Sequence, residues 1–292
     1  MMTPVVAVIS PGAMGAAVGK RLVGRGVTVL TSLSGRSRDS IARAGAAGMR
    51  AATDEEIASA DFVLSILPPG EASGLAIRLV PTLRASNSKT VYVDCNAVNP
   101  ATVERIAEVI ASTGCAFIDV GIIGPPPTTA EHGSQDEMSG PRFYASGAAA
   151  PRLARLRDFG LDVRVLDGAM SAASALKMSY AGITKGTQAL GAAMMLAATR
   201  AGSAEALLAE LSFSQREVLT WLKRQLPGMP AKAYRWVAEM QEIAGFVADD
   251  PAARELYEGA ARFYERIAED VRAEQSDVAA LRAFLDKEAS GS

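Results

Sequence analysis

The sequence has few aromatic residues and almost no net charge for its length of 292 residues. Phe, Trp and Tyr make up 5% of the chain, which argues against a protein that stacks nucleic-acid bases on aromatic side chains. The formal net charge of -2 argues against a polybasic nucleic-acid binder and against an acidic solvating tail. We therefore expect no nucleic-acid partner.

Cysteine and histidine are also scarce. The two cysteines are too few for a disulfide scaffold, and Cys95 and Cys115 are predicted to lie at opposite ends of neighbouring parallel strands. At roughly 3.3 Å per residue they would be about 13 Å apart, whereas a disulfide needs Cα atoms within about 7 Å. We expect two reduced, buried thiols in a cytoplasmic protein. The single histidine, His132, cannot build a histidine-rich metal site, and it is either catalytic or an exposed loop residue.

Long apolar runs are absent as well. No run approaches the roughly 18 residues that a membrane-spanning helix needs. The segment Met1–Pro4 leads straight into an apolar strand and lacks the basic region of a signal peptide. We expect neither a targeting segment nor a membrane partner.

The first half of the chain alternates between strand and helix patterns. Apolar, β-rich runs predict strands, and amphipathic stretches with capping residues predict helices between them. This alternation indicates right-handed βαβ units and a parallel, doubly wound Rossmann sheet. The predicted strands cover 5–9, 27–31, a short piece near 49, 62–67, 90–94, 116–120, 142–146 and 162–166. The predicted helices cover 16–25, 37–46, a short piece that a capping box opens at 53–56, 70–84, 100–112 and 150–158, and a loop covers 121–140.

Strand patterns stop after about residue 167. A long helix rich in small residues is predicted over 171–199, and apolar residues recur at helical spacing from there to Leu285. The chain length fits about two domains. We expect a Rossmann domain over 1–167 and an all-helical domain over 168–292.

The turn after the first strand follows a dinucleotide-binding fingerprint. Gly12 and Gly15 hold the second and third glycine positions of G-x-G-x-x-G, with Ser10 in place of the first. Gly12 lets the backbone approach a pyrophosphate, and the next helix offers the free N–H groups of its N-terminus. The predicted cofactor contacts here are Ser10, Gly12, Ala13, Met14 and Gly15. The alternative is an ordinary tight turn.

The end of the second strand predicts which dinucleotide is bound. NAD-binding domains usually have a carboxylate there, which holds the ribose 2′-hydroxyl. Residues 31–38 have hydroxyls and two guanidinium groups but no acid before residue 39, and this set suits a 2′-phosphate. The predicted contacts are Ser32, Ser34, Arg36 and Ser37. We expect NADP(H), with NAD(H) less favoured; the alternative is a solvated basic loop.

With these residues in view, the chain resembles the β-hydroxyacid dehydrogenase superfamily over nearly its whole length. This superfamily includes 3-hydroxyisobutyrate and 6-phosphogluconate dehydrogenases. Three stretches resemble, more narrowly, a branch with its own C-terminal domain of unknown function, DUF1932: Gly124–Pro127, Leu176–Gly182, and Lys232–Val237 with Glu239–Met240. The wider resemblance is carried by Gly12–Gly15, Ser65–Pro69, Asp94–Asn96 with Pro100, Asp119–Pro125 and Ser171–Lys177.

The resemblance implies a function and an assembly. It implies hydride transfer between NAD(P) and a hydroxyl or carbonyl carbon, in a homodimer whose C-terminal helical domains share the active site. It also implies that Lys177 is the general acid or base. The other residues with implied roles are Leu67, Pro68 and Asn96 at the cofactor and Ile123, Gly124 and Pro125 at the substrate. For Asn96, the alternative is a turn-forming residue after a strand.

Lys177 is also a candidate from its own surroundings. It lies in a predicted helix of small residues, where a cofactor can approach closely and where poor solvation favours proton exchange by the amine. The alternative is a lysine whose amine reaches solvent from a packed helix. Tyr180 and Ala181 replace an asparagine pair of the superfamily, and the Tyr180 hydroxyl can substitute for the lost amide. Lys185 either binds an anionic substrate group or is simply exposed.

Three functions stay open on the sequence. The first is an NADP(H)-dependent oxidoreductase that interconverts a hydroxyl and a carbonyl on a small, acidic substrate, with Lys177 as general acid and base. The second is reduction of an imine in the same architecture, and Lys177 favours the first over it. The third is an NADP(H)-binding sensor or scaffold without turnover, which Ser10 and the lost asparagine support.

Overall fold

The computed structural model describes residues 3–127 and 140–287. The chain forms two compact units, of which the first ends at Met178 and the second begins at Ser179. This junction lies inside helix α7 (Ala172–Arg200), because the first turns of α7 are bonded to the sheet of the first unit. It comes later in the chain than the expected boundary at residue 167. The roles expected of the two domains stay predictions: cofactor binding for the first, and substrate binding and dimerisation for the second.

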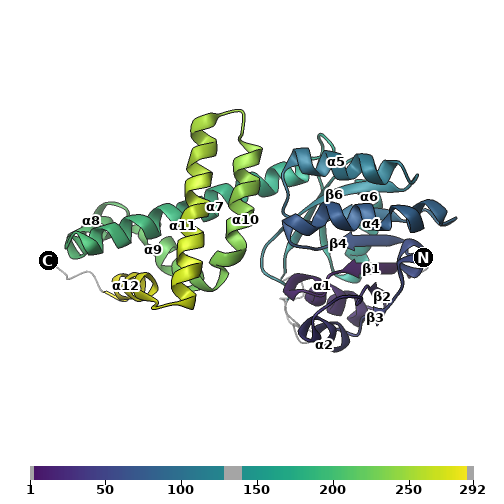
Figure 1. Cartoon of the computed structure of the whole chain (residues 1–292), viewed down its shortest axis with the longest axis horizontal. Coiled ribbons are helices and arrows are strands. Elements are labelled where there is room, and N and C mark those ends of the chain that lie inside the picture. Colours follow the sequence, from purple (N-terminus) through teal and green to yellow (C-terminus); the bar gives the residue numbers. More distant parts are fainter. Residues whose placement is uncertain (1–2, 128–139, 288–292) are drawn as a thin grey trace. The chain divides into compact units, whose positions relative to one another are not determined.

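The first unit is built on one eight-stranded sheet (Figure 1). Its strand order is β3-β2-β1-β4-β5-β6-β7-β8, and the pairs are parallel except for β6 with β7. This architecture confirms the predicted doubly wound Rossmann fold. The strands are β1 (Val5–Ile9), β2 (Thr28–Thr31), β3 (Arg50–Ala51), β4 (Phe62–Ser65), β5 (Val91–Asp94), β6 (Ala116–Ile123), β7 (Arg142–Ser146) and β8 (Asp162–Val165).

One prediction for this sheet is wrong. The loop predicted over 121–140 begins as strand, because β6 continues to Ile123. Its last residues pair with the antiparallel strand β7, Gly121 with Tyr144 and Ile123 with Arg142. The pairing supplies backbone hydrogen bonds to residues of β6 that extend past the end of β5. The glycine-rich composition of the segment 121–140 does not indicate this partner strand.

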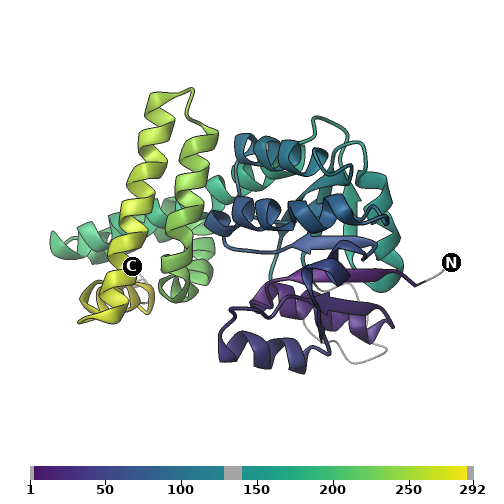
Figure 2. The same cartoon turned by 45° about the vertical axis from the view of Figure 1, so that its right-hand side comes forward.

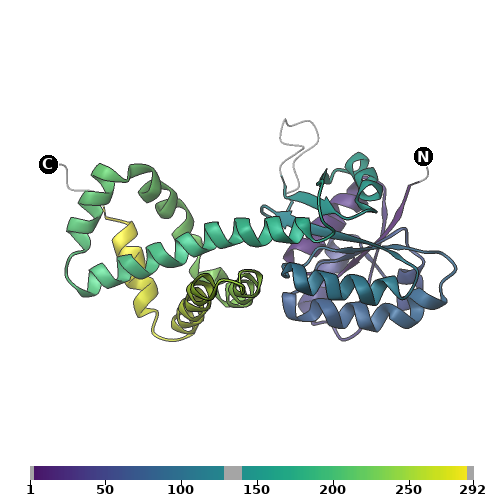
Figure 3. The same cartoon turned by 90° about the horizontal axis from the view of Figure 1, so that it is seen from above.

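Helices cover both faces of the sheet. Alternate residues of β1 point to opposite sides: Val6 and Val8 pack with α1 and α2, whereas Ala7 and Ile9 pack with the core under α3, α4 and α5. Figure 3 shows α4 and α5 side by side along one face. The helices are α1 (Ala13–Gly24), α2 (Arg38–Ala46), α3 (Asp54–Ala58), α4 (Ala72–Ala85), α5 (Pro100–Ala111) and α6 (Ala150–Leu153), with 3-10 turns at Pro69–Glu71 and Ala154–Phe159.

Both cysteines are buried and unpaired, as the sequence predicts. Cys95 directly follows β5, and Cys115 directly precedes β6. Burial raises the pKa of the Cys95 thiol well above its ordinary value, so this thiol stays protonated at neutral pH.

The second unit is helical, which confirms the predicted helical C-terminal region. Its helices α10 and α11 run side by side (Figures 1 and 2). They share a core in which the Trp236 ring meets the Tyr264 ring edge-on at 5.2 Å. Among the described residues, none of the helices has the length and apolarity needed to cross a membrane. After α7 come α8 (Ala204–Ser214), α9 (Arg216–Gln225), α10 (Ala233–Phe246), α11 (Pro251–Arg272) and α12 (Ser276–Leu285), with 3-10 turns at Leu226–Gly228 and Pro230–Lys232.

Candidate cofactor and active site

The carboxyl ends of the parallel strands form the edge at which the predicted site residues gather. The strand order reverses at β1, which lies between β2 and β4. In open α/β sheets, ligands bind beyond the strand ends at such a reversal, because the loops on its two sides leave the sheet in opposite directions. The turn after β1, the loop after β2 and the segment after β4 all begin there.

The turn after β1 has the backbone of a complete fingerprint. Ser10 adopts a φ of 78°, in the left-handed region where a glycine is unstrained. The serine therefore keeps the backbone shape of the missing glycine at a cost on the order of 1 kcal/mol. At Gly15, a Cβ atom would lie 2.2 Å from the Ser10 carbonyl oxygen, so only glycine lets α1 pack this closely on the turn.

The same turn fits a pyrophosphate. A Cβ atom at Gly12 would meet nothing within 4 Å, so the space beside this backbone is open. Helix α1 begins at Ala13, has no side-chain cap at Gly12, and has no acidic residue in its first turn. Its first N–H groups and the positive end of its dipole are therefore suited to an anion. The predicted contacts Ala13 and Met14 lie in this first helical turn rather than before the helix.

The loop after β2 brings only part of the predicted set together. Ser32 is buried, Ser34 is exposed, and the Ser37 Oγ accepts a hydrogen bond from the Ser40 N–H at 3.3 Å, which caps α2. Arg36 reaches a cavity of about 230 Å³ beside the segment that follows β4. The lining residues are Arg36, Leu67, Glu71, Gly74, Leu75 and Arg78.

Sequence reasoning missed three charged residues of this edge. Arg43 of α2 donates from Nε to the carbonyl oxygen of Pro11 at 2.9 Å, and so stabilises the turn after β1. Glu71 and Arg78 line the cavity that Arg36 enters. No local motif identifies them, because they join the site only when the segment after β4 meets the loops after β1 and β2.

Asn96 ties two strand ends together. Its Oδ1 accepts from the Leu67 N–H at 2.6 Å, and its Nδ2 donates to the Ser65 Oγ at 2.8 Å and to the Asp94 Oδ1 at 2.9 Å. The amide is buried and engaged at both ends. It thereby fixes the backbone of Leu67, which leads to Pro68 and the cavity.

Two carboxylates lie next to each other in the sheet, behind this edge. Asp94 and Asp119 are register partners on β5 and β6, and both side chains are buried. Burial, with a contribution from the Asp119 charge, raises the pKa of Asp94 to about 7. Burial also raises the pKa of Asp119 to about 6, although hydrogen bonds from Ser174 oppose this rise. The Asp94 Oδ2 has no protein partner among the described residues.

Asp119 anchors the start of α7. Its two oxygens accept from the Ser174 N–H and the Ser174 hydroxyl, both at 2.7 Å. On β7, the Ser146 Oγ accepts from the Ala173 N–H at 2.9 Å and donates to the Met170 carbonyl at 2.8 Å. A carboxylate at a helix N-terminus also interacts favourably with the helix dipole. These bonds fix the first turns of α7 on the sheet.

Lys177 lies at the end of β6 as a result. Its Nζ donates a hydrogen bond to the Ile122 carbonyl oxygen, and its stem passes Gly121. A Cβ atom at Gly121 would lie 2.6 Å from the Ala173 carbonyl oxygen and 3.2 Å from the Lys177 Cβ. Glycine at this position is therefore required for α7 to approach the strand.

The predicted substrate segment continues from this strand end. Ile123 closes β6, and Gly124 has a φ of 125°, a conformation that favours glycine. A Cβ atom at Gly124 would also lie 3.0 Å from the Pro141 Cα. Pro125 follows as an exposed residue. His132 lies outside the described residues.

The other predicted site residues belong to the second unit. Tyr180 is half exposed on α7. Lys185 is largely buried, forms an ion pair with Glu239 of α10, and lies 5.1 Å from the centre of the Trp236 ring. The Tyr264 hydroxyl donates to the Lys185 carbonyl oxygen at 2.6 Å. The positive charge of Lys185 is therefore balanced by the Glu239 carboxylate.

The fold and this edge define an α/β protein with a turn suited to an anion at the strand reversal and a lysine at the end of a neighbouring strand. Comparison with known families agrees with this description of the fold. Residues 5–159 match the NAD binding domain of 6-phosphogluconate dehydrogenase, and the chain belongs to this family. Residues 198–267 match a domain of unknown function, DUF1932. Both matches confirm the resemblance found in the sequence.

Similar proteins extend the comparison over nearly the whole chain. A solved conserved protein of unknown function, described as structurally similar to 3-hydroxyacid dehydrogenases, is 28% identical with a TM-score of 0.69, covering 97% of this chain and 99% of its own. A 3-hydroxyisobutyrate dehydrogenase of Mycobacterium tuberculosis, solved with L-serine, is 20% identical with a TM-score of 0.67, covering 97% and 99%. An uncharacterized 28.5 kDa protein of Methanothermus fervidus is 26% identical over 76% of this chain and 82% of its own.

The fold is also that of imine reductases. An imine reductase from Myxococcus stipitatus, solved in complex with NADP+, has a TM-score of 0.52 at 17% identity, covering 97% of this chain and 100% of its own. At this identity the likeness concerns the fold alone.

Proposed function

We propose that this protein is an NADP(H)-dependent oxidoreductase that interconverts a hydroxyl and a carbonyl group on a small, acidic substrate, with Lys177 as general acid and base. The position of Lys177 carries the proposal. Its amine is held by the Ile122 carbonyl oxygen at the carboxyl end of β6, on a helix that Asp119 anchors to the sheet. A proton donor at this edge of a dinucleotide-binding fold is suited to reduction of a carbonyl.

In this chemistry, Lys177 donates the proton in one direction and accepts it in the other. When bound, the nicotinamide cofactor supplies a hydride to the substrate carbon or accepts one from it. In the reductive direction, the Lys177 ammonium gives a proton to the carbonyl oxygen, whose π electron pair forms the new O–H bond. In the oxidative direction, the neutral amine takes the hydroxyl proton as the carbonyl forms. Gly121 leaves room for the lysine stem, and the Ile122 carbonyl orients the amine.

The preference for NADP(H) is supported by the loop after β2. Arg36 is the one guanidinium of this loop that lines the cavity beside Leu67, among the described residues. Ser32 and Ser34 complete the proposed contacts, and Ser37 reinforces the loop by capping α2. In the turn after β1, the contacts proposed for the pyrophosphate are Ser10, Gly12 and the first turn of α1.

The substrate contacts remain proposals for Ile123, Gly124, Pro125, Tyr180 and Lys185. The chemistry of Lys185 supports an anionic substrate group, which would have to compete with Glu239 for the ammonium. Tyr180 has an exposed ring and is proposed to hold the substrate oxygen through its hydroxyl. The cytoplasmic location also stays a prediction.

A kinetic screen tests the proposed function. NADPH oxidation is followed with a panel of oxo acids, aldehydes and cyclic imines, for the unaltered chain, Lys177→Ala and a matched Lys89→Ala control. Lys89 lies two residues before β5, at the opposite edge of the sheet, where its Nζ donates a hydrogen bond to the Leu83 carbonyl oxygen. We expect turnover of oxo acids, a loss of about 10²-fold or more in kcat for Lys177→Ala, and little change for the control.

Three outcomes of the screen would contradict the proposal in different ways. Unchanged kcat in Lys177→Ala removes the lysine from the chemistry. Turnover of imines without turnover of carbonyl compounds favours imine reduction. NADPH binding that is unaffected by Lys177→Ala, with no turnover of either class, favours a sensor or scaffold.

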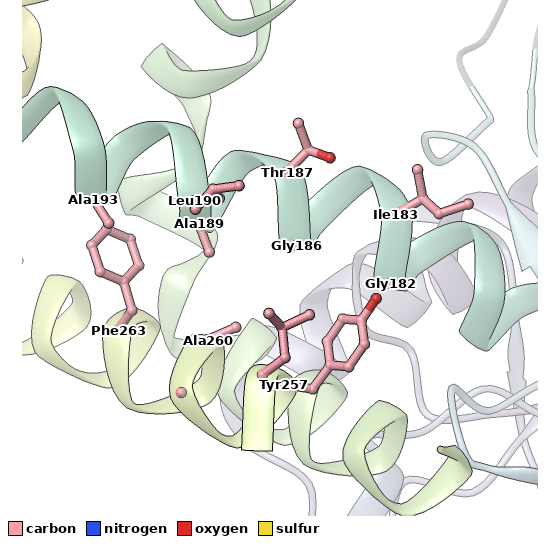
Figure 4. Close-up of a pocket in the computed structure, with 12 residues that line it drawn as sticks. Gly182, Ile183, Gly186, Thr187, Ala189, Leu190, Ala193, Tyr257, Ala260 and Phe263 are labelled. Atoms are coloured by element: carbon pink, nitrogen blue, oxygen red, sulfur yellow. The ribbon is translucent and has the colours of Figure 1, made fainter. Parts of the chain in front are cut away.

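We also propose that the protein is a homodimer joined through the second unit. Helices α7 and α11 border an apolar cavity of about 390 Å³, which Figure 4 shows between Gly182 and Ala193 of α7 and Tyr257 and Phe263 of α11. At its rim, Ile183 is 69% exposed and Leu190 is 65% exposed. Large apolar side chains gathered around a cavity are typical of a surface that another chain covers, here a second copy.

Sedimentation of two variants tests the dimer. Leu190→Asp places a charge on the proposed interface, and we expect it to give monomers. Phe213→Asp is the matched control, because Phe213 of α8 is 87% exposed and does not line the cavity. A monomeric unaltered chain at micromolar concentration, or equal effects of both substitutions, would contradict this interface.

A further inference from the structure

Arg36, on which the proposed preference for NADP(H) depends, already has an anionic partner. Its Nη1 lies 3.4 Å from the Oε2 of Glu71. Arg36 belongs to the loop after β2, and Glu71 to the 3-10 turn Pro69–Glu71 after β4, so the pair joins two loops at the strand reversal. The Arg36 side chain is 25% exposed and that of Glu71 is 52% exposed. Glu71 is thus the more exposed partner of the pair.

The second guanidinium of the cavity is neutralised in the same way. The Nη2 of Arg78 lies 3.4 Å from the Oδ1 of Asp54, at the start of α3. Arg36, Glu71 and Arg78 line one cavity of about 230 Å³. Each arginine therefore has its own carboxylate, and the cavity is nearly neutral, although the loop sequence alone indicates a positive one.

We propose that Glu71 sets the cofactor selectivity of this protein, by neutralising Arg36 and so weakening the binding of a 2′-phosphate relative to a ribose 2′-hydroxyl. This inference rests on the proposed NADP(H) function and concerns the same site. A phosphate monoester carries about −1.5 to −2 charges at pH 7, so it meets repulsion from Glu71 when it approaches Arg36. A hydroxyl is uncharged, and it can donate a hydrogen bond to the carboxylate. Glu71 therefore opposes NADP(H) and not NAD(H).

The expected size of the effect follows from the exposure of the pair. Charges near the protein surface interact through a high effective dielectric constant, and exposed ion pairs contribute little. Glu71→Gln removes the charge and keeps the side-chain shape. We expect it to tighten the binding of a 2′-phosphorylated nucleotide about three- to ten-fold and to leave the unphosphorylated nucleotide within about two-fold.

Calorimetric binding to the full chain tests this role without any turnover. The probes are 2′,5′-ADP against 5′-AMP, and NADP+ against NAD+. Glu71→Gln is compared with Glu108→Gln, an exposed acid of α5 that does not line the cavity and gives the same change in net charge. Thermal unfolding of both variants is measured as well, because Glu71 directly precedes α4, where a carboxylate favours the helix dipole.

The proposal predicts tighter binding of 2′,5′-ADP and NADP+ in Glu71→Gln alone, at low ionic strength, and a smaller gain when Arg36→Gln is also present. It is overturned if Glu71→Gln leaves the affinity unchanged, or if Glu108→Gln changes it equally. The proposed function fails separately: an unaltered chain that binds NAD+ more tightly than NADP+ contradicts the NADP(H) preference, even if Glu71→Gln still favours 2′,5′-ADP. An unaltered chain that prefers NADP+, with no response in Glu71→Gln, contradicts only the role of Glu71.

Discussion

The paired carboxylates predict an unusual dependence of stability on pH. Burial raises the pKa of Asp94 to about 7 and that of Asp119 to about 6, both from an ordinary value of 3.8. At pH values between the ordinary pKa of 3.8 and these raised values, the folded protein binds more protons than the unfolded chain. The free energy of unfolding therefore falls as pH rises from about 4 to about 7, with the full stabilisation present below the unfolded pKa.

The magnitude can be worked out for Asp94. One pKa unit corresponds to about 1.4 kcal/mol, so Asp94 alone accounts for a loss on the order of 4 kcal/mol across this range. Asp94→Asn removes the ionisation. The amide oxygen can still accept the hydrogen bonds that Oδ1 receives from the Asn96 N–H and Nδ2, each at 2.9 Å. The variant is thus expected to gain most over the unaltered chain at high pH.

Urea unfolding at several pH values between about 5 and 8 measures this effect. We expect the unaltered chain to lose stability as pH rises, and Asp94→Asn to lose less and to be the more stable of the two at about pH 8. Asp158→Asn, an exposed acid that follows α6, is the matched control and should follow the unaltered chain. Stability that is flat or rises with pH, or an Asp94→Asn variant that is less stable at about pH 8, would refute the reasoning.

Three further substitutions test the local geometry of the site. Gly121→Ala places a Cβ atom 2.6 Å from the Ala173 carbonyl oxygen; we expect a loss of about 1–3 kcal/mol by urea unfolding together with a lower kcat. Ser10→Gly relieves the backbone at a φ of 78°, so thermal unfolding should show a gain of up to about 1 kcal/mol, and a loss would count against strain. Asp119→Ala leaves the buried Ser174 N–H and hydroxyl without an acceptor; we expect a loss of roughly 2–4 kcal/mol and a fall in kcat, both rescued in part by Asp119→Asn, whose one amide oxygen replaces one of the two acceptors.

Much of the fold could be predicted because its signals are local. The capping box Thr53–Glu56 and the cap of α5 at Asn99 form as the sequence predicts. Buried strands are continuous apolar runs, and a turn residue or a cap closes each one. The end of β6 was missed because Gly121–Ile123 owes its strand conformation to a partner in β7, which no local pattern reveals.

The candidate site shows the same division. Gly12 and Gly15 could be found because a fingerprint has fixed spacing. The partners of the predicted charges could not be found, since Arg36 meets Glu71 and Lys185 meets Glu239 only through the tertiary fold. These ion pairs change the chemistry that the charges offer. The role of Asp119 at the start of α7 likewise depends on a contact between distant segments.

The central claim is that Lys177 exchanges the substrate proton beside the bound cofactor. A crystal structure of the protein with NADP+ tests it most directly, because the position of the amine can be measured against the nicotinamide ring. The account predicts that the Lys177 Nζ lies within about 3–4 Å of the space above the nicotinamide C4, where a reacting oxygen would sit. A Lys177 amine that points into bulk solvent, away from the ring, would contradict the account.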